Sequence, residues 1–555
     1  MFIDRNVRLR VSPEKFQNDA YDIVNLFYKG SVLRVRPDGE SPGDTPPGDT
    51  SPGDTPPIAA GCDLINVTQT GDLFHIEALF NDPQGGAPQS GDPHGNDPQG
   101  GDLRGGIIRA TASSARGGIV RAIASSAPGG PKNRAYSLKM ALYRLLKARA
   151  SLESGTKISL PWGALVGIRP VKIYADLAAD GAGRAEIIAE MKRAYDVPEK
   201  SSELCLQIAA AQREIVEKYN PRTDYMLYIG IPFCASRCAY CSFPSDAHNK
   251  AEKYAAQYID ALLKEIYYIA GYMENAEMRL KAVYIGGGTP TALAAPELRK
   301  LLDGVSDAFG GESPDEYTVE AGRADTMDCD KLNVIRNSAK IAKRLRLCVN
   351  PQTMNARTLE LVGRSHTPED VVKAYRLARE SGFDDINMDI IAGLPGETAA
   401  DFINTLDAVF NLGPDSVTSH TLCIKRSSRI NEYRERYMCP EAAVTEAMQE
   451  DARRRAAGAG MRPYYLYRQK NTAGGLANVG YAIKGRECVY NVHEMADRID
   501  ILAAGAGAVS KFVYPGESRV ERVFNVKNLL EYISRIDEMT RRKTAFLAAA
   551  CERRR

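Results

Sequence analysis

The chain has 555 residues, of which 44% are hydrophobic and 26% are charged; this is the composition of a globular protein with room for two to four domains of roughly 100–200 residues each. The 72 basic and 70 acidic residues nearly cancel, which excludes a uniformly charged surface for nucleic acid or membranes and leaves only local patches. No apolar run approaches the ~18 residues of a membrane span, and the first residues, MFIDRNVRLRVSPEKF, lack the apolar core of a signal peptide.

The first 160 residues predict a small α+β domain. The stretch DAYDIVNLFYKGSVLRVRP indicates a short helix followed by a strand. Two further runs, CDLINVTQ and DLFHIEALF, are rich in β-branched and aromatic residues and predict a pair of strands.

Two stretches of this N-terminal domain, 37–57 and 82–132, are dominated by Pro, Gly, Asp and small polar residues. Such a composition cannot bury enough apolar surface to offset the entropy of ordering the chain. The second stretch contains a duplicated unit, GGIIRATASSAR followed by GGIVRAIASSAP, which is too short for a solenoid. We expect both to be disordered insertions, and an expanded repeat is a simpler explanation than a functional tail.

The chain regains regular patterning at AYSLKMALYRLLKAR, whose apolar residues follow a helical period. The next segment, LPWGALVGIRPVKI, contains the only tryptophan, Trp162. We interpret this segment as an apolar docking element between domains, and residues 161–223 as a helical linker.

From residue 224 onward, short β-rich runs alternate with amphipathic helical stretches. Strand, helix and strand repeated in this way predict a parallel sheet in an α/β protein. About six units are too few for a complete barrel, so we expect a partial (β/α)6 barrel over 224–432, followed by a mainly helical C-terminal domain over 433–555 with a strand-like ECVYNV and a Gly-rich AAGAGAVSK. The expected strands are 225–231, 281–287, 317–322, 344–350, 385–391 and 415–421.

The stretch IPFCASRCAYC places Cys234, Cys238 and Cys241 directly after the first of these strands, at the end of a barrel where such enzymes carry their chemistry. Three thiolates can bind three irons of a 4Fe–4S cluster and leave the fourth iron open. The alternative is a zinc site completed by a distant histidine, with His248 as the nearest one. The other eight cysteines are scattered, and an odd total without a secretion signal indicates reduced thiols in a cytoplasmic protein.

The cysteine motif resembles that of the radical S-adenosylmethionine (SAM) superfamily. Together with YIGGGTPT, VNPQTMN, LVGRSHT, NMDIIAGLPGET and GAGAVSK, it is similar to the oxygen-independent coproporphyrinogen III oxidase family. The segment YYLYRQKNTAGGLANVGYA resembles the branch called coproporphyrinogen dehydrogenase. The similarity runs from about Leu160 to Lys511 and does not include the insertions.

This resemblance implies that the three cysteines bind a 4Fe–4S cluster and that SAM chelates its open iron. An electron from the cluster then breaks a carbon–sulfur bond of SAM and gives a 5′-deoxyadenosyl radical, while the protein supplies orientation. Glycines after a strand can form a plain turn or let the backbone approach a ligand. The positions that match SAM-binding positions of the family are Gly287, Gly288, Thr289, Gln352 and Arg364, with Tyr228 and Tyr240 as flanking aromatic residues.

Two acidic residues on the expected strands are further candidates for SAM binding. Glu320 ends the third strand and can accept a hydrogen bond from the SAM amine or ribose, although a solvated strand end is the plain alternative. Asp389 lies on an otherwise apolar strand, so its charge needs a partner.

The implied reaction is the oxidative decarboxylation of two propionates of coproporphyrinogen III, which gives the vinyl groups of protoporphyrinogen IX. The partners would be this porphyrinogen, an electron donor for the cluster and an electron acceptor. Carboxylate substrates call for basic side chains, and Arg426, Arg468 and Lys470 are candidates unless they form a solvated face.

The sequence departs from the family pattern at two positions. Gly230 stands where many members have a histidine, and Phe243 stands where the well-studied oxidases have a further cysteine. Related heme-trafficking proteins also have phenylalanine at the second position. A heme-binding chaperone and a radical SAM enzyme with another substrate are therefore the alternatives.

Overall fold

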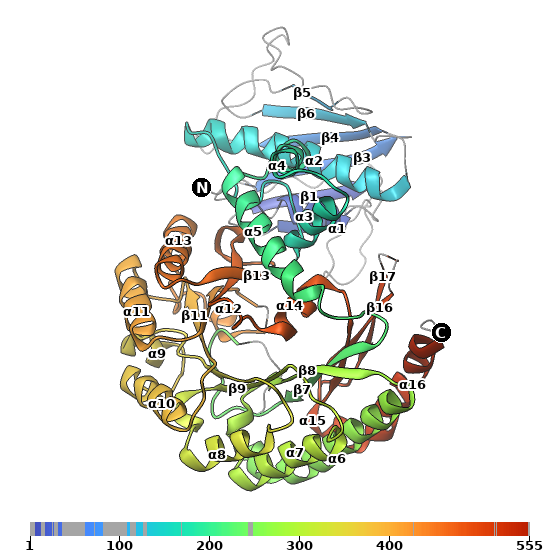
Figure 1. The fold of residues 1–555 in the computed structure, drawn as a ribbon. Coiled ribbons are helices and arrows are strands. Elements are labelled where there is room, and N and C mark those ends of the chain that lie inside the picture. The colour runs from blue at the N-terminus through green and yellow to red at the C-terminus, as the bar shows by residue number, and fades with distance from the viewer. Residues whose placement is uncertain are drawn as a thin grey trace, which may run out of the picture. The chain divides into compact units, whose positions relative to one another are not determined.

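The computed structural model shows two compact units, one formed by Met1–Val166 with Ile188–Ser201 and the other by Gly167–Ile187 with Ser202–Arg555. Figure 1 labels their helices and strands. The structure describes residues 6–12, 17–24, 26, 32–35, 62–70, 73–80, 108–111, 118–125, 130–167, 169–241, 248–425, 427–514, 517 and 519–552.

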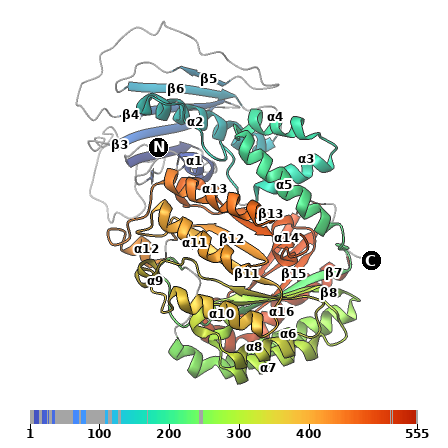
Figure 2. The same cartoon turned by 60° about the vertical axis from the view of Figure 1, so that its left-hand side comes forward.

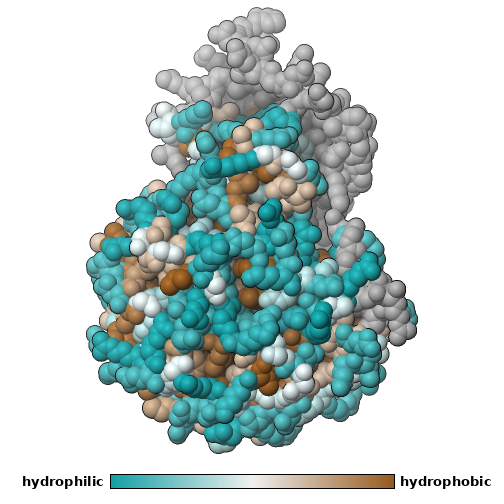
Figure 3. All heavy atoms as spheres, in the orientation of Figure 1, coloured by the Kyte–Doolittle hydropathy of each residue, from teal (hydrophilic) through white to brown (hydrophobic). Residues whose placement is uncertain are grey.

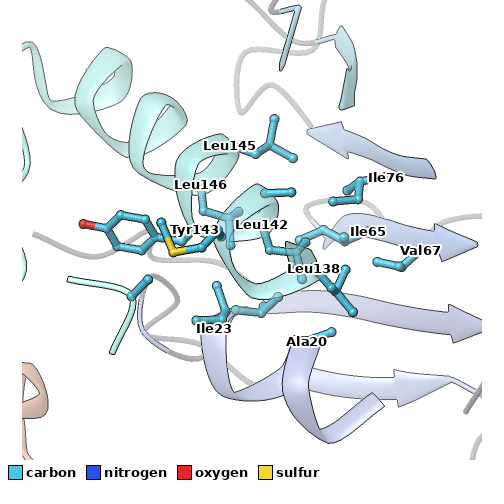
Figure 4. Close-up of a cluster of buried hydrophobic side chains, with 14 of the residues drawn as sticks. Ala20, Ile23, Ile65, Val67, Ile76, Leu138, Leu142, Tyr143, Leu145 and Leu146 are labelled. Carbon is cyan, nitrogen blue, oxygen red and sulfur yellow. The ribbon is translucent and has the colours of Figure 1, made fainter. Parts of the chain in front are cut away.

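The first unit is a six-stranded sheet, in the order β2-β1-β3-β4-β6-β5, with two helices packed on it. In helix α2 (Gly130–Ser154), Leu138, Leu142 and Leu146 recur every four residues and so share one face. Figure 4 shows this face turned toward Ile65 and Ile76 of the sheet, all fully or almost fully buried. The other elements are β1 (Asn6–Ser12), α1 (Gln17–Val24), β2 (Val32–Val35), β3 (Cys62–Thr70), β4 (Leu73–Phe80), β5 (Ile108–Thr111) and β6 (Gly118–Ser125).

The prediction that 82–132 is disordered throughout is wrong where the duplicated unit lies. The two copies form β5 and β6, which pair antiparallel with each other, and β6 also pairs with β4. Each copy has a short run of β-branched residues that fits a half-buried strand, and the composition of the surrounding residues concealed this signal. The first expected insertion, 37–57, and the rest of the second up to 129 lie outside the described residues.

The second unit contains an eleven-stranded sheet in the order β13-β14-β12-β11-β10-β9-β8-β7-β15-β16-β17. Its strands β7 to β12 all run parallel to one another, which confirms the predicted α/β partial barrel of six strands. Strands such as β7 and β11 are buried on both faces and therefore appear as nearly continuous apolar runs, whereas β12 is buried but has the largely polar sequence SVTSHT. They are β7 (Asp224–Ile231), β8 (Arg279–Gly287), β9 (Glu316–Gly322), β10 (Leu345–Val349), β11 (Ile386–Ala392) and β12 (Ser416–Thr421).

Helices connect these parallel strands, and Figures 1 and 2 show α6, α7, α8 and α10 on the outer side of the sheet. Two of the connecting helices, α10 and α11, begin with capping boxes at Thr367 and Thr398, which satisfy the first backbone amides. The helices are α6 (His248–Asn275), α7 (Ala295–Ala308), α8 (Cys329–Ser338), α9 (Ala356–Leu361), α10 (Pro368–Glu380) and α11 (Ala399–Leu412), with 3-10 turns η2 (Pro290–Ala292) and η3 (Ala324–Thr326).

The C-terminal region contributes strands as well as helices to the second unit. Its five strands extend the barrel sheet at both edges, whereas the sequence had indicated one strand-like run, ECVYNV. The prediction of a strand over ECVYNV is wrong, because helix α14 begins within this run, at Val489. The carboxylate of Glu316 accepts hydrogen bonds from the amides of Val489 and Tyr490 (2.8 and 3.3 Å), and an anion at this position stabilises a helix start.

The remaining elements of the chain are as follows: α3 (Pro170–Ala179), α4 (Arg184–Tyr195), α5 (Glu199–Val216), α12 (Arg429–Glu432), α13 (Ala442–Gly458), β13 (Arg462–Arg468), η4 (Ala473–Gly475), β14 (Ala477–Ala482), α14 (Val489–Ala496), β15 (Asp500–Ala504), β16 (Val509–Tyr514), β17 (Arg519–Phe524), α15 (Leu529–Ser534) and α16 (Ile536–Glu552). None of the described helices is both long enough and apolar enough to cross a membrane. On the face drawn in Figure 3, polar residues cover most of the coloured surface and apolar residues form small scattered groups.

Candidate active site

A cavity of about 430 Å³ opens at the carboxyl ends of the parallel strands. This is the end of a barrel at which loops carry catalytic groups. All twelve residues that the sequence singled out for the cluster and SAM line it: Tyr228, Cys234, Cys238, Tyr240, Cys241, Gly287, Gly288, Thr289, Glu320, Gln352, Arg364 and Asp389. The structure thus brings together side chains that lie up to 161 positions apart in the sequence, from Tyr228 to Asp389.

The cysteine loop follows β7 and is held by the glycines that follow β8. The amide of Gly288 donates to the carbonyl of Ile231 (2.6 Å), and the amide of Thr289 donates to the carbonyl of Phe233 (2.7 Å). A Cβ atom on Gly288 would lie 2.3 Å from the Phe233 oxygen, so only glycine fits there. The glycine motif therefore positions the loop that carries Cys234, in addition to lining the cavity.

The other side of the cysteine loop is held by two later segments. The amide of Ala239 donates to the carbonyl of Val362 (2.9 Å), and the carbonyl of Ala239 accepts from the amide of Ile430 (3.1 Å). The hydroxyl of Ser236 donates to the carbonyl of Gly363 (2.9 Å). Backbone contacts on both sides thus fix the loop before any ligand binds.

Two buried arginines approach the middle cysteine. The Nη1 atoms of Arg323 and Arg364 lie 3.9 and 3.8 Å from the Cys238 sulfur. Arg323 is paired with Asp325 (2.8 Å), whereas Arg364 donates to the carbonyl of Asn350 (2.7 Å). These two guanidinium groups place positive charge beside the Cys238 sulfur.

The donor set fits a cluster better than a single ion. Among the described residues, no three His, Cys, Asp or Glu side chains lie close enough together to hold one metal ion. An iron–sulfur cluster does not require this, because each thiolate binds a different iron. The side chain of His248, proposed above as a zinc ligand, lies outside the described residues, as does Phe243.

Two amide side chains in the cavity present acceptors without donors. The side-chain oxygens of Gln352 and Asn350 are buried and have no hydrogen-bond partner within the described chain. Gln352 also has a φ of +67°, a left-handed conformation that is uncommon outside glycine. A buried unpaired acceptor costs about 1–3 kcal/mol, so both oxygens are suited to accept from the amine or hydroxyl groups of a ligand.

Glu320 lies deep in the cavity, where it accepts a hydrogen bond from the hydroxyl of Tyr284. Burial raises the pKa of Glu320 to about 7; the Tyr284 hydrogen bond opposes the shift and the negative charge of Asp389 adds to it. Gly286 makes room for this carboxyl group, since a Cβ there would lie 2.9 Å from its Cδ atom. The carboxyl group therefore changes charge near neutral pH.

Asp389 has the partner that its position on an apolar strand required. Its Oδ2 lies 3.5 Å from Nε2 of His420, and its Oδ1 accepts from the side-chain amide (Nδ2) of Asn387 (2.7 Å). Burial alone would raise the pKa of Asp389, but the hydrogen bonds and charge of these neighbours lower it overall. The hydroxyl of Tyr467 lies 3.2 Å from Nδ1 of His420 and extends the network along the cavity wall.

Three tyrosines form an aromatic wall. Tyr284 and Tyr490 stack with ring centroids 4.6 Å apart. The ring of Tyr228 is stacked nearly equidistant from these two, with its centroid 6.2 Å from that of Tyr284 and 6.1 Å from that of Tyr490. The hydroxyl of Tyr240 accepts a hydrogen bond from Arg364 (3.1 Å), which also approaches the Cys238 sulfur. Flat aromatic faces of this kind suit the stacking of a planar group.

The basic residues proposed for substrate carboxylates lie elsewhere. Arg468 is buried and Lys470 is exposed, and neither lines the cavity, while Arg426 lies outside the described residues. A half-buried lysine, Lys425, lines the cavity instead. The lining residues that the sequence analysis missed include Tyr284, Asn350, His420, Lys425, Tyr467, Tyr490 and Asn491.

The chain is similar to several known proteins. Residues 228–409 match the family model described as the radical SAM superfamily. The chain is 35% identical over 408 residues, 72% of its length and 80% of the relative's, to the oxygen-independent coproporphyrinogen-III oxidase-like protein HemZ of Bacillus subtilis (strain 168). It is 28% identical over 302 residues, 54% of its length and 74% of the relative's, to the heme chaperone HemW of Escherichia coli (strain K12). The solved structure of Escherichia coli coproporphyrinogen III oxidase (HemN), a radical SAM enzyme, aligns over 60% of this chain and 73% of its own, with 24% identity and a TM-score of 0.45.

Proposed function

The chain belongs to the radical SAM superfamily and, within it, to the family of oxygen-independent coproporphyrinogen-III oxidase-like proteins, and from this premise we propose that it oxidatively decarboxylates coproporphyrinogen III to protoporphyrinogen IX. The superfamily uses a 4Fe–4S cluster and SAM. The observation that carries the proposal is the convergence of three cysteines and nine predicted SAM-binding residues on one cavity at the carboxyl ends of the strands.

The residues of the chain would bind and orient these groups. Cys234, Cys238 and Cys241 would hold the cluster, which when bound supplies the electron that splits SAM into methionine and a carbon radical. Gln352 would accept from a donor group of SAM through its unpaired oxygen, and Glu320 would accept from the amine or ribose. The side chains that line the cavity would limit the access of water to the bound groups.

The substrate reaction consists of one hydrogen-atom transfer and one electron transfer for each propionate. A hydrogen atom leaves the carbon next to the pyrrole, carbon dioxide then leaves, and one electron passes to an external acceptor, so that a vinyl group remains. Lys425 is positioned to bind a carboxylate at the cavity, since its side chain is half-buried there. An ammonium group is a common partner for such anions.

A heme-binding chaperone is the second candidate, and two observations favour it. HemW proteins, which are heme chaperones, are among the relatives of this chain. Phe243 replaces the further cysteine of the well-studied oxidases. A chaperone of this kind would retain the cysteine loop and the SAM cavity but would bind heme and release it unchanged.

An anaerobic turnover assay separates these two functions. The cluster is reconstituted, and the protein is incubated with SAM, a chemical reductant, coproporphyrinogen III and an electron acceptor. We expect protoporphyrinogen IX and two molecules of carbon dioxide per product, with 5′-deoxyadenosine formed in step. Stable stoichiometric heme binding without any decarboxylated product contradicts the proposal and supports the chaperone.

A further inference from the structure

A buried arginine outside the predicted site residues, Arg323, lies against the cysteine loop. It follows the end of β9 directly and is only 3% exposed. Its Nη1 atom donates to the hydroxyl of Ser236 (2.8 Å) and lies 3.9 Å from the Cys238 sulfur. A permanent positive charge therefore contacts the loop from a residue 85 positions away in the sequence.

Neighbours within the chain hold the guanidinium group of Arg323 in place. Its Nε and Nη2 atoms donate to Oδ1 and Oδ2 of Asp325 (2.9 and 2.8 Å), which makes a bidentate pair. The third nitrogen, Nη1, is bound to Ser236. Because all three nitrogens have partners in the chain, Arg323 is suited to act through its charge and not to bind the carboxylate of a ligand.

The charge of Asp325 does not cancel the charge of Arg323 at the sulfur. The carboxylate binds the edge of the guanidinium group formed by Nε and Nη2, whereas Nη1 is the atom that approaches Cys238. The side chain of Asp325 is also 20% exposed and lines a separate cavity beside α10. Solvent screens a partly exposed charge more than a buried one, so the nearer and less screened charge is the positive one.

Both members of the pair carry their charge in the folded protein. Burial alone would raise the pKa of Asp325, but the neighbouring His366 and Arg323 lower it overall. The Nδ1 atom of His366 lies 3.6 Å from Oδ1 of Asp325. A guanidinium group does not lose its proton in proteins, so the charges of the pair stay constant over the ordinary pH range.

We propose that Arg323, held by Asp325, raises the reduction potential of the cluster that the cysteine loop binds. The inference rests on the proposed binding of that cluster. Reduction adds one electron from a chemical reductant and moves no atoms, so the reduced form carries one more negative charge. A cation next to a ligand sulfur stabilises this form, since charge and hydrogen bonds near the sulfurs set the potential of such clusters. Arg323 contacts no reacting atom and acts through the Cys238 sulfur.

Arg364 approaches the same sulfur, at 3.8 Å. It also matches a SAM-binding position of the family, so that its substitution would change SAM binding and the potential together. Arg323 has no such predicted contact and therefore gives the cleaner test.

The test is a potentiometric titration of the reconstituted protein without SAM or porphyrinogen, with dithionite and redox mediators and with visible absorbance as the readout. In Arg323→Met, we expect the ratio of reduced to oxidised cluster at a fixed potential to fall about tenfold, which is about 59 mV for one electron. Arg323→Lys keeps the charge and should recover most of the wild-type potential. An unchanged or higher potential in Arg323→Met overturns the proposal.

Asp325→Asn provides a change of the opposite sign. It removes the negative charge and leaves the bond between Arg323 and Ser236 available, so the ratio of reduced to oxidised cluster should rise, by about threefold because the carboxylate is partly screened. A general disturbance of the fold would not shift the two variants in opposite directions. A fall in this ratio overturns the proposal, and Asp325→Asn alone decides if Arg323→Met does not take up the cluster.

The matched control is Arg379→Met. Arg379 also pairs with an aspartate, Asp415 (2.8 Å), but it does not line the cavity, and Asp415 directly precedes β12 at the amino end of the strands. The control should keep the wild-type potential, and an equal fall overturns the proposal because total charge would then explain the effect. Since the titration contains no porphyrinogen, a failure to decarboxylate it would contradict the proposed function and leave this test intact.

Discussion

Two groups of buried polar residues in the barrel unit differ in how completely they are paired. In the first, Glu265 and Lys543 are fully buried and lie 2.5 Å apart. The other carboxylate oxygen of Glu265 accepts from the amide of Gly505 (2.9 Å) and from the hydroxyl of Tyr532, and Asn525 also donates to this carboxylate. This group ties α6 to the C-terminal helices, and both oxygens of its carboxylate are satisfied within the protein.

The second group, in the cavity, is left incomplete. The side-chain oxygens of Asn350 and Gln352 have no donor, and Glu320 has its pKa raised to about 7 by burial. Native proteins pair nearly all buried polar atoms, and perturbed carboxyl groups gather at functional sites. In this comparison the fully paired group holds the fold together, whereas at the cavity two unpaired acceptors and a carboxyl group of raised pKa occur side by side and are suited to a ligand.

The largest effect should come from removing one cluster ligand. In Cys238→Ala, we expect the reconstituted protein to lack the cluster absorbance, because the remaining two thiolates cannot hold it. SAM cleavage should then fall to background, as measured by 5′-deoxyadenosine formation under anaerobic reduction.

The matched control for this variant is Cys205→Ala, since Cys205 is also a buried cysteine but does not line the cavity. It should keep both the cluster and SAM cleavage. Retention of 5′-deoxyadenosine formation by the Cys238 variant would refute the role assigned to the cysteine loop.

Removing a charge from the fully paired group around Glu265 should lower the stability of the protein and leave ligand binding unchanged. Lys543→Met leaves the Glu265 carboxylate buried without its cation, which costs about 3–5 kcal/mol of unfolding free energy. Denaturant titration measures this loss. The SAM affinity of the folded fraction should stay within about twofold of the wild type, because the two groups have no residue in common.

The control here is Lys300→Met, which breaks the exposed ion pair between Lys300 and Asp260. An exposed pair contributes about 0–1 kcal/mol, so this variant should unfold almost as the wild type does. If Lys543→Met were equally mild, the buried group would not stabilise the fold and the contrast between the two groups would fail.

The sequence was a good guide to the six barrel strands because their cause is local. Each predicted strand agrees with the structure to within two residues at either end, since short runs rich in β-branched, aromatic or other apolar residues alternate with helical stretches along this part of the chain. The start of α14 has a distant cause, because the carboxylate that caps it belongs to Glu316, 173 positions earlier than Val489. Periodicity within ECVYNV could not reveal that partner.

The candidate site also contains residues that the sequence could predict and residues that depend on distant packing. Acidic residues on the barrel strands, such as Glu320 and Asp389, were predictable, because a charge on a mostly apolar strand needs a partner or a ligand. His420 also lies on a strand, and its place in SVTSHT was a signal that the analysis did not use. Tyr490 and Asn491 reach the cavity from a C-terminal helix, and no local pattern shows where that helix packs.

A smaller effect should come from removing one unpaired oxygen. In Gln352→Met, a buried acceptor without a donor is replaced by an apolar group of similar size, so the SAM-free protein should be no less stable than the wild type. SAM binding should weaken by about five- to tenfold, the equivalent of one hydrogen bond of ~1 kcal/mol. Calorimetry measures the affinity, and thermal unfolding measures the stability.

Gln212→Met is the control for this substitution. Gln212 is buried on α5, its amide nitrogen lacks a partner, and it does not line the cavity. It should show a similar change in stability and no change in SAM affinity. A loss of SAM affinity in both variants would mean that the unpaired atoms do not mark the ligand site.

The smallest effect is a pH dependence that Glu320 introduces. Its pKa is about 7 in the folded protein because burial disfavours the charge, compared with 4.5 ordinarily. Only the ionised carboxylate accepts fully from an amine or hydroxyl of SAM, so SAM affinity should rise by roughly threefold from pH 6 to pH 8. Glu320→Gln should remove this rise in calorimetric titrations.

Stability should move in the opposite direction to affinity. Between about pH 4.5 and 7 the folded protein keeps a proton on Glu320 that the unfolded chain has lost, so the free energy of unfolding falls as pH rises through this window. Glu397 behaves alike, because burial also raises its pKa to about 7, but it bonds to Thr353 and does not line the cavity. Glu397→Gln should therefore flatten the stability slope in part and leave the pH dependence of SAM binding intact. If it altered SAM binding as Glu320→Gln does, a raised carboxyl pKa would not distinguish the ligand site from the rest of the core.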